Sequence, residues 1–86
     1  MAFRLRDGVS AADTDYGTAL LDTDNGEYWN LNPTGALVLR TLLDGGTPRQ
    51  AAKALTEQYA VDADAAGQDV EDLVGGLHAA GLVKEE

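Results

Sequence analysis

The chain has 86 residues, 44% of them apolar, a formal net charge of −9 and no cysteine. This length allows one small domain, and the lack of cysteine excludes disulfides, thiolate metal ligands and a cysteine nucleophile. The negative charge disfavours nucleic acids and anionic lipid surfaces, and without a signal-peptide core or a stretch near 20 apolar residues we expect a cytoplasmic protein without a membrane span.

Strands are predicted in the first part of the chain. Apolar and polar residues alternate over residues 3–9, which is typical of a short strand or an extended arm, whereas residues 10–17 have the composition of a turn-rich connection. Residues 18–31 are predicted to form a hairpin, because Asn25-Gly26 supplies the positive φ angles of a tight turn.

The two-residue period of a strand divides the side chains of this hairpin between two faces. We expect Trp29 and Leu31 to point into the core together with Leu20. Tyr28 and Asn30 then lie on the other face, where Tyr28 is exposed or covers a flank.

Three helices are predicted after the hairpin, each from a capping signal. Asn32 can cap the first helix, Thr47 and Gln50 form a capping box at the second, and either Asp62 or Asp64 caps the third. The order of strands followed by helices predicts an α+β domain with helices packed on a small antiparallel sheet. We expect one domain over residues 1–86, with a core over about 8–83 and a frayed tail at 84–86.

The third helix carries an apolar stripe with the spacing i, i+3, i+4, i+7 of one helical face: Val70, Leu73, Val74 and Leu77. Gly75 and Gly76 interrupt this helix, although each glycine costs about 1 kcal/mol relative to alanine. Either they pack closely against the first helix, or they form a flat floor beside a bound peptide.

Patterns for catalysis or metal binding are weak. The single serine, Ser10, and the single histidine, His78, lack the setting of a nucleophile elbow. Residues 22–27 resemble the start of a calcium loop, but Gly26 and Pro33 occupy the fifth and twelfth positions, where oxygen ligands are needed. We therefore expect no enzyme activity, no metal site and no cofactor.

An ordered set of short motifs resembles the PqqD-like family. It comprises Glu27-Tyr28-Trp29-Asn30-Leu31-Asn32-Pro33-Thr34-Gly35-Ala36, Leu42-Leu43-Asp44-Gly45, Thr47-Pro48, Ala51-Ala52, Leu55, Tyr59, Val61-Asp62, Asp69-Val70, Leu73, Leu77 and Gly81-Leu82-Val83. The set covers roughly residues 10–83 and is specific through its order. Gly67, Gly75 and Gly76 depart from the pattern, since helices of the family often carry Ala, Glu or Leu there.

This resemblance implies a winged helix-turn-helix-like domain, with a three-stranded antiparallel sheet and three helices, that acts as a RiPP recognition element (RiPP, ribosomally synthesised and post-translationally modified peptide). The leader segment of the precursor would add to the edge of the third strand and lie against the third helix, by the backbone pairing that an open edge permits. The implied strand residues are Glu27, Tyr28, Trp29, Asn30 and Leu31. The implied helix residues are Asp69, Val70, Asp72, Leu73, Val74 and Leu77. Among these we expect Leu73 and Leu77 to face the core, and Val70 and Val74 to face the groove rim.

The family also suggests partners. Members of this length occur in lasso peptide biosynthesis, so the implied partners are a precursor leader, a leader peptidase and, as a further candidate, a cyclase of the same pathway. Two alternatives stay open: a peptide chaperone for a radical SAM enzyme, and a winged-helix nucleic-acid-binding module, which the count of only six Lys and Arg residues disfavours. The open strand edge allows a monomer or a weak dimer.

Overall fold

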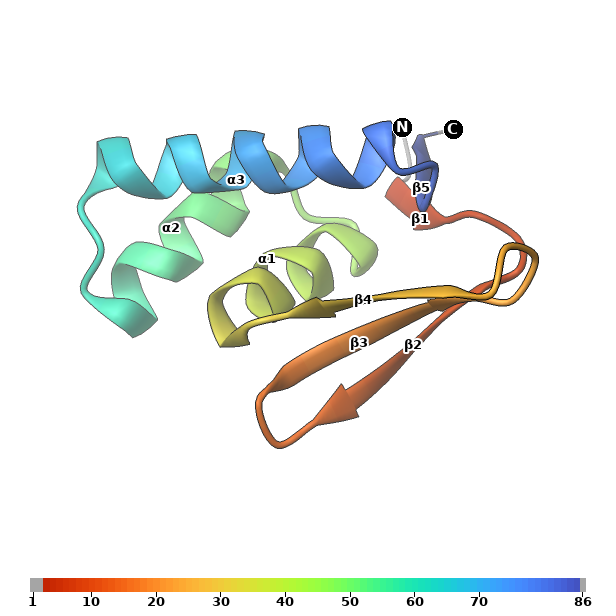
Figure 1. Cartoon of the computed structure of the whole chain (residues 1–86). Helices are drawn as coiled ribbons and strands as arrows, with labels where there is room; N and C mark the ends of the chain where they lie inside the picture. Colours follow the sequence, from red (N-terminus) through yellow and green to blue (C-terminus); the bar gives the residue numbers. More distant parts are fainter. Residues whose placement is uncertain (1–2, 86) are drawn as a thin grey trace.

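A three-stranded antiparallel sheet and three helices build the fold of the computed structural model, which describes residues 3–85 (Figure 1). The sheet contains β2 (Val9–Thr14), β3 (Gly17–Asp22) and β4 (Glu27–Leu31) in that spatial order. The helices are α1 (Pro33–Leu43), α2 (Pro48–Tyr59) and α3 (Ala63–Ala79). The predicted α+β class, with a three-stranded antiparallel sheet followed by three helices, is confirmed.

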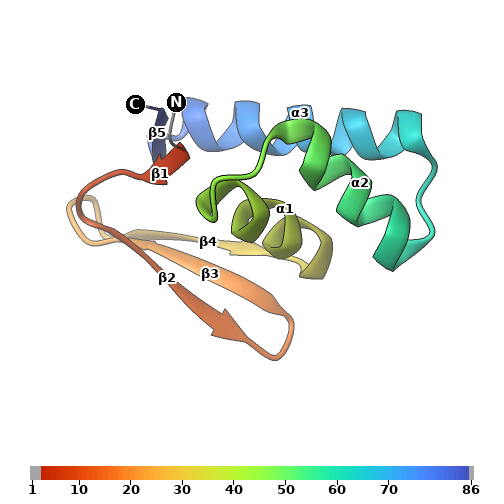
Figure 2. The ribbon, with the colours of Figure 1, turned by 180° about the vertical axis from the view of Figure 1, so that it is seen from behind.

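Two short strands, β1 (Phe3–Leu5) and β5 (Val83–Glu85), form a separate antiparallel pair at the end of α3 (Figure 2). Lys84 and Glu85 were expected in a frayed tail, but they pair with Arg4 and Phe3, while residue 86 lies outside the described residues. The expectation is wrong for these two residues because their partners lie at the opposite end of the sequence. No helix in residues 3–85 is long and apolar enough to cross a membrane.

The first strand of the sheet lies further along the chain than expected. Residues 10–14 were expected in a turn-rich connection, yet they belong to β2, which pairs with β3 from Val9 opposite Asp22 to Thr14 opposite Gly17. Apart from Val9, which is half-buried, the residues of β2 are exposed. An exposed outer strand has no apolar alternation, and its pairing with β3 therefore left no sign in the pattern.

The predicted second hairpin is confirmed, and so is its division into two faces. Leu20 pairs with Trp29 and Thr18 with Leu31, so that Leu20, Trp29 and Leu31 share the face that looks toward the helices. Leu31 is buried as expected, whereas Trp29 is 37% exposed and not a core residue. The Trp29 side chain stays partly exposed because β4 is an edge strand of the sheet.

All three helices start at predicted capping residues. The Asn32 side chain accepts a hydrogen bond from Gly35 N at 2.8 Å, and Asp62, not Asp64, accepts one from Ala65 N at 2.9 Å. Thr47 and Gln50 exchange backbone and side-chain hydrogen bonds of 2.8 and 3.1 Å in a capping box. The helices therefore begin where local chemistry requires them to begin.

The hydrophobic core surrounds α1. This helix contacts β3 and β4 on one side and α2 and α3 on another, as Figures 1 and 2 show from opposite directions. The most deeply buried large side chains come from β3, from all three helices and from the residue before β5: Leu20, Val38, Leu39, Leu55, Val70, Leu77 and Leu82. Because α1 lies between them, α3 and β4 face each other across a floor that α1 provides.

Candidate functional site

The outer edge of β4 has free backbone groups. β3 is the central strand, and its alternate residues bond to β2 and to β4. Thr23 N donates to Gly8 O at 2.9 Å, on the β2 side. Because the bonding direction alternates from one residue to the next, the N–H and C=O groups of Leu20, three residues before Thr23, point toward β4, where Leu20 pairs with Trp29.

It follows that the odd-numbered residues of β4 bond to β3. The even-numbered residues, Tyr28 and Asn30, direct their N–H and C=O groups away from the sheet. No strand in residues 3–85 covers this edge. An extended peptide could use these groups to add a further strand.

The inner side of this edge is apolar. The Trp29 side chain lies on the face toward the helices but remains 37% exposed, next to the buried Leu31. On the outer face the Tyr28 side chain is 65% exposed and Asn30 is exposed too, while Glu27, on the same face as Trp29, is also exposed. A strand added to β4 would therefore meet an apolar ring on its inward side.

The second wall is α3, which reaches over α1 toward the end of β4. A cavity of about 250 Å³ lies beside α3, next to the residue that follows β4, and its lining residues come from Asn32, from α1, from α2 and from α3: Asn32, Thr34, Gly35, Val38, Leu55, Asp69, Asp72 and Leu73. Three of the predicted site residues, Asp69, Asp72 and Leu73, are thus brought together beside the residue that follows β4. We call this space between β4 and α3, with α1 as its floor, the groove.

The helical stripe of α3 divides in a way that the sequence did not predict. Val70 is 1% exposed and Leu77 fully buried, so Leu77 faces the core as expected but Val70 does not face a rim. Leu73, expected to face the core, does pack against it, but it is only half-buried and also lines the groove. Val74 is also half-buried but points the other way.

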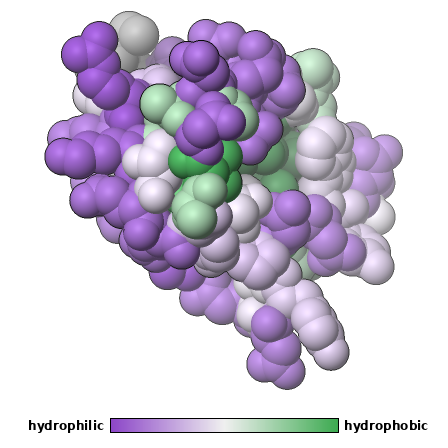
Figure 3. Space-filling model, turned by 90° about the vertical axis from the view of Figure 1, so that its left-hand side faces the viewer, coloured by the Kyte–Doolittle hydropathy of each residue, from purple (hydrophilic) through white to green (hydrophobic). Residues whose placement is uncertain are grey.

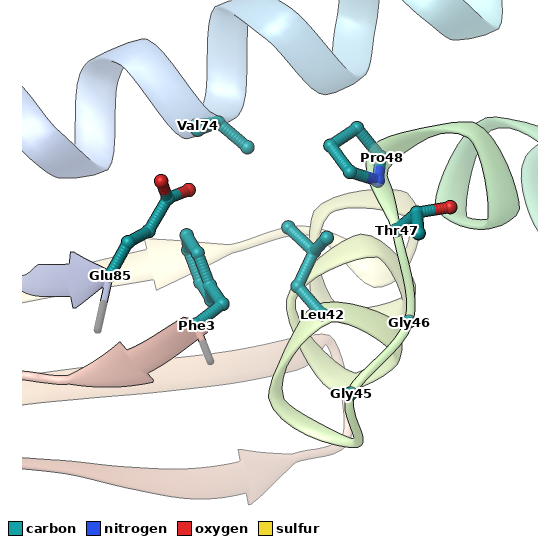
Figure 4. A pocket seen from close by; sticks show the side chains of 8 residues that line it. All are labelled: Phe3, Leu42, Gly45, Gly46, Thr47, Pro48, Val74 and Glu85. Atoms are coloured by element: carbon teal, nitrogen blue, oxygen red, sulfur yellow. The ribbon is translucent and has the colours of Figure 1, made fainter. Parts of the chain in front are cut away.

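Val74 lines a different cavity, of about 320 Å³, on the opposite flank of α3 (Figure 4). Its side chain points into the cavity that Phe3, Leu42 and Pro48 also line. The assignment of Val74 to the groove rim is therefore wrong. Successive residues of an α-helix are 100° apart, so neighbours such as Leu73 and Val74 lie on opposite flanks of the apolar stripe. The spacing of the stripe does not tell which of the two flanks faces the edge of the sheet.

Helical geometry places Gly76 on the groove flank of α3, a position that the sequence motifs did not assign to the site. It lies one turn after Leu73 on the same flank, whereas Gly75 is exposed on the far side of the helix. A Cβ atom at either position would meet nothing within 4 Å, so neither glycine packs against the first helix. Of the two explanations for these glycines, close packing is excluded.

Acidic groups dominate the rim of the groove. Asp69 and Asp72 line it without any basic residue, and Gln68 donates to Asp72 at 2.9 Å. Figure 3 views the end of the molecule at which α2 and α3 join and shows a mostly hydrophilic surface around a small hydrophobic patch. A ligand of this end is favoured when it carries positive charge.

The turn between β3 and β4 bounds the opposite end of the groove. The Asp22 carboxylate accepts hydrogen bonds from the Asn25 side chain at 2.8 Å and from Asp24 N at 3.1 Å, and it lies 2.8 Å from Arg6. The bond from Asn25, together with that from Arg6, lowers the pKa of Asp22 in spite of its burial. Residues 22–27 resembled the start of a calcium loop, and these contacts give them another role. The first carboxylate of that segment, Asp22, binds protein donors within the turn.

Comparisons with known proteins agree with this geometry. The family described as "Coenzyme PQQ synthesis protein D (PqqD)" matches residues 17–83, which is most of the chain. The chain belongs to the PqqD family. The comparison with curated proteins gives no match.

Two solved structures resemble this PqqD family member over almost its whole length. One, "Lasso peptide synthetase B1 complexed with the leader peptide", has 45% sequence identity and a TM-score of 0.90, and the match covers 99% of this chain and 100% of that one. The other, "TbiB1 in Complex with the TbiA(beta) Leader Peptide", has 25% identity and a TM-score of 0.84, with 96% of each chain covered.

Proposed function

We propose that this PqqD family member binds the leader segment of a ribosomally synthesised precursor peptide, without catalysing a reaction itself. The observation that carries the proposal is the open edge of β4, whose Tyr28 and Asn30 backbone groups face outward beside the α3 wall. The two similar structures are both leader complexes and support the same ligand class.

The leader would pair in extended form with β4. Alternate side chains of a strand point to opposite faces, so one set enters the groove between Trp29 and Leu73 while the other set faces solvent. The backbone bonds supply affinity that depends little on sequence, and the apolar contacts inside the groove supply selectivity. The acidic rim at Asp69 and Asp72 accelerates association with a basic leader.

A role in lasso peptide biosynthesis follows from the likeness to lasso peptide synthetase B1. In that role the chain would act in the cytoplasm and deliver the bound precursor to a leader peptidase, with a cyclase acting afterwards. Incubation of a precursor with the chain alone should leave the peptide intact by mass spectrometry, whereas addition of the peptidase should release the core.

The backbone pairing is tested by amide hydrogen exchange, followed by NMR, with and without the leader of the cognate precursor. In the free protein the amides of Trp29 and Leu31 should exchange slowly, because they bond to β3, and those of Tyr28 and Asn30 quickly. Bound leader should slow exchange at Tyr28 and Asn30, and a scrambled leader should not. Protection confined to other elements would contradict strand addition at β4.

The α3 wall is tested by a matched pair of substitutions, Leu73→Glu and Val74→Glu. Both residues are half-buried neighbours on one helix, but they line cavities on opposite flanks. Leu73→Glu should weaken leader binding at least about tenfold, the equivalent of 1.4 kcal/mol, and Val74→Glu should leave it unchanged, as measured by Trp29 fluorescence and labelled-peptide anisotropy. Circular dichroism checks that both variants fold. An equal loss in both would point to helix damage and not to a groove contact.

A further inference from the structure

One arginine side chain binds the segments that adjoin both walls of the groove. Arg6 lies between β1 and β2, and its Nε atom donates to the carbonyl oxygen of Gly81 at 2.6 Å. Its Nη2 atom lies 2.8 Å from the carboxylate of Asp22, and its Nη1 atom donates to Asp24 at 3.1 Å and to the Asp7 carbonyl oxygen at 2.9 Å. A single guanidinium therefore has partners in three separate segments.

Two of these partners lie next to the walls. Gly81 directly follows Ala80, the C-cap of α3, so its carbonyl group marks the end of the helical wall. Asp22 ends β3 and orders the turn from which β4 starts, through the bonds of its carboxylate to Asp24 and Asn25. The Arg6 side chain thus joins the end of α3 to the start of β4.

We propose that Arg6 is a positioning residue that sets the distance between α3 and β4 at this end of the groove and so prepares the groove for the leader. The inference rests on the proposed leader binding. A strand that must contact both walls at once binds more weakly when their spacing fluctuates, because binding then has to order them. Guanidinium suits this role, since its planar donors can hold several acceptors in a fixed arrangement.

The matched variants are Arg6→Met and Arg40→Met. Each removes one positive charge, but Arg40 lies 3.7 Å from Asp13 and joins α1 to β2, away from the groove. Arg6→Met should weaken leader affinity about tenfold, mainly through faster dissociation, by losing preorganisation, and Arg40→Met should change it less than about twofold. Arg6→Lys, which keeps the charge but not the planar fork, should fall between wild type and Arg6→Met.

A direct measurement of wall spacing separates positioning from general stability. The chain has no cysteine, so spin labels can be attached to Glu27→Cys and Ala79→Cys in the free protein without further changes. The distance distribution between the labels should broaden when Arg6→Met is added and stay narrow with Arg40→Met, at a temperature where unfolding curves show all variants folded.

The outcomes separate this proposal from the proposed function. If wild type binds the leader and Arg6→Met binds equally well, or if the label distances stay narrow in Arg6→Met, the positioning role is overturned and leader binding stands. If wild type does not bind, the proposed function fails and the label distances still decide whether Arg6 fixes the spacing. Should Arg6→Met not fold, Arg6→Lys and Asp24→Asn replace it, the latter because it removes the negative charge of one exposed ion pair, and each should give a smaller broadening.

Discussion

Asp22 is a charged side chain that the fold buries to 3% exposure at the end of a strand. Hydrogen bonds from Asn25 and Arg6 lower its pKa below the ordinary aspartate value. A carboxyl group whose pKa is lower in the folded state stabilises the fold above its unfolded-state pKa, and this contribution is lost as the pH falls through the folded-state pKa. Asp22 is therefore a source of acid sensitivity in this domain.

The substitution Asp22→Asn should reduce the acid dependence of stability. Thermal unfolding followed by circular dichroism between about pH 2 and pH 6 should show wild type losing stability below about pH 4, near the unfolded aspartate pKa, and the variant losing less. Asp69→Asn, at an exposed position on α3, serves as the control. A variant with an acid limb as steep as that of wild type would show that other carboxylates cause the loss.

The helix α3 combines a core face, a groove flank and an open flank within one element. Gly76 lies on the groove flank, one turn after Leu73, and Gly75 lies on the open flank. Gly75→Leu and Gly76→Leu should each stabilise the helix by up to about 1 kcal/mol, because glycine is a poor helix former and an added Cβ meets no atom.

Leader affinity should distinguish these two variants. Gly76→Leu should reduce it by filling the groove, while Gly75→Leu should leave it unchanged, as measured by isothermal titration calorimetry beside urea unfolding. A loss in Gly75→Leu as well would show that α3 must remain flexible for binding, and the groove flank would then need another test.

Local chemistry explains which elements the sequence revealed. The caps at Asn32 and Thr47 depend on residues near in sequence and were predicted, as was the cap of α3, for which the sequence allowed Asp62 or Asp64. The predicted turn is present too, with a positive φ at Gly26 but not at Asn25. The β2 strand is almost wholly exposed and so carries no apolar alternation, and the pairing of β1 with β5 joins residues that lie far apart in the sequence, so neither left a local pattern. The site was predicted at the level of its two elements, but the flank of Val74 and the contacts of Arg6 depend on how α3 is rotated and placed, which spacing does not specify.

The charge of the molecule acts on the fold as a whole. With a net charge of −9 and a radius of gyration of 12.4 Å, carboxylates on all sides repel one another when the screening length exceeds the size of the protein. Raising NaCl from about 0.01 to about 0.15 M shortens that length from about 30 to about 8 Å. We expect the melting temperature to rise over this range.

Choline chloride at matched ionic strength is the control, because it screens charge without a small cation that carboxylates could bind. Equal increases in the two salts, measured by scanning calorimetry, would identify screening as the cause. A melting temperature that falls with salt would show instead that ion pairs such as Arg6 with Asp22 outweigh the repulsion.

The pairing of β1 with β5 has a consequence for protein engineering. Phe3 and Glu85 are opposite residues of an antiparallel ladder, and such residues have Cα atoms about 5 Å apart. Figures 1 and 2 show β1 and β5 side by side. A unit that enters and leaves at one point can be spliced into a surface loop of a host enzyme without forcing the host backbone apart. The edge of β4 takes no part in that junction, so a spliced copy would give its host a docking strand for peptide substrates.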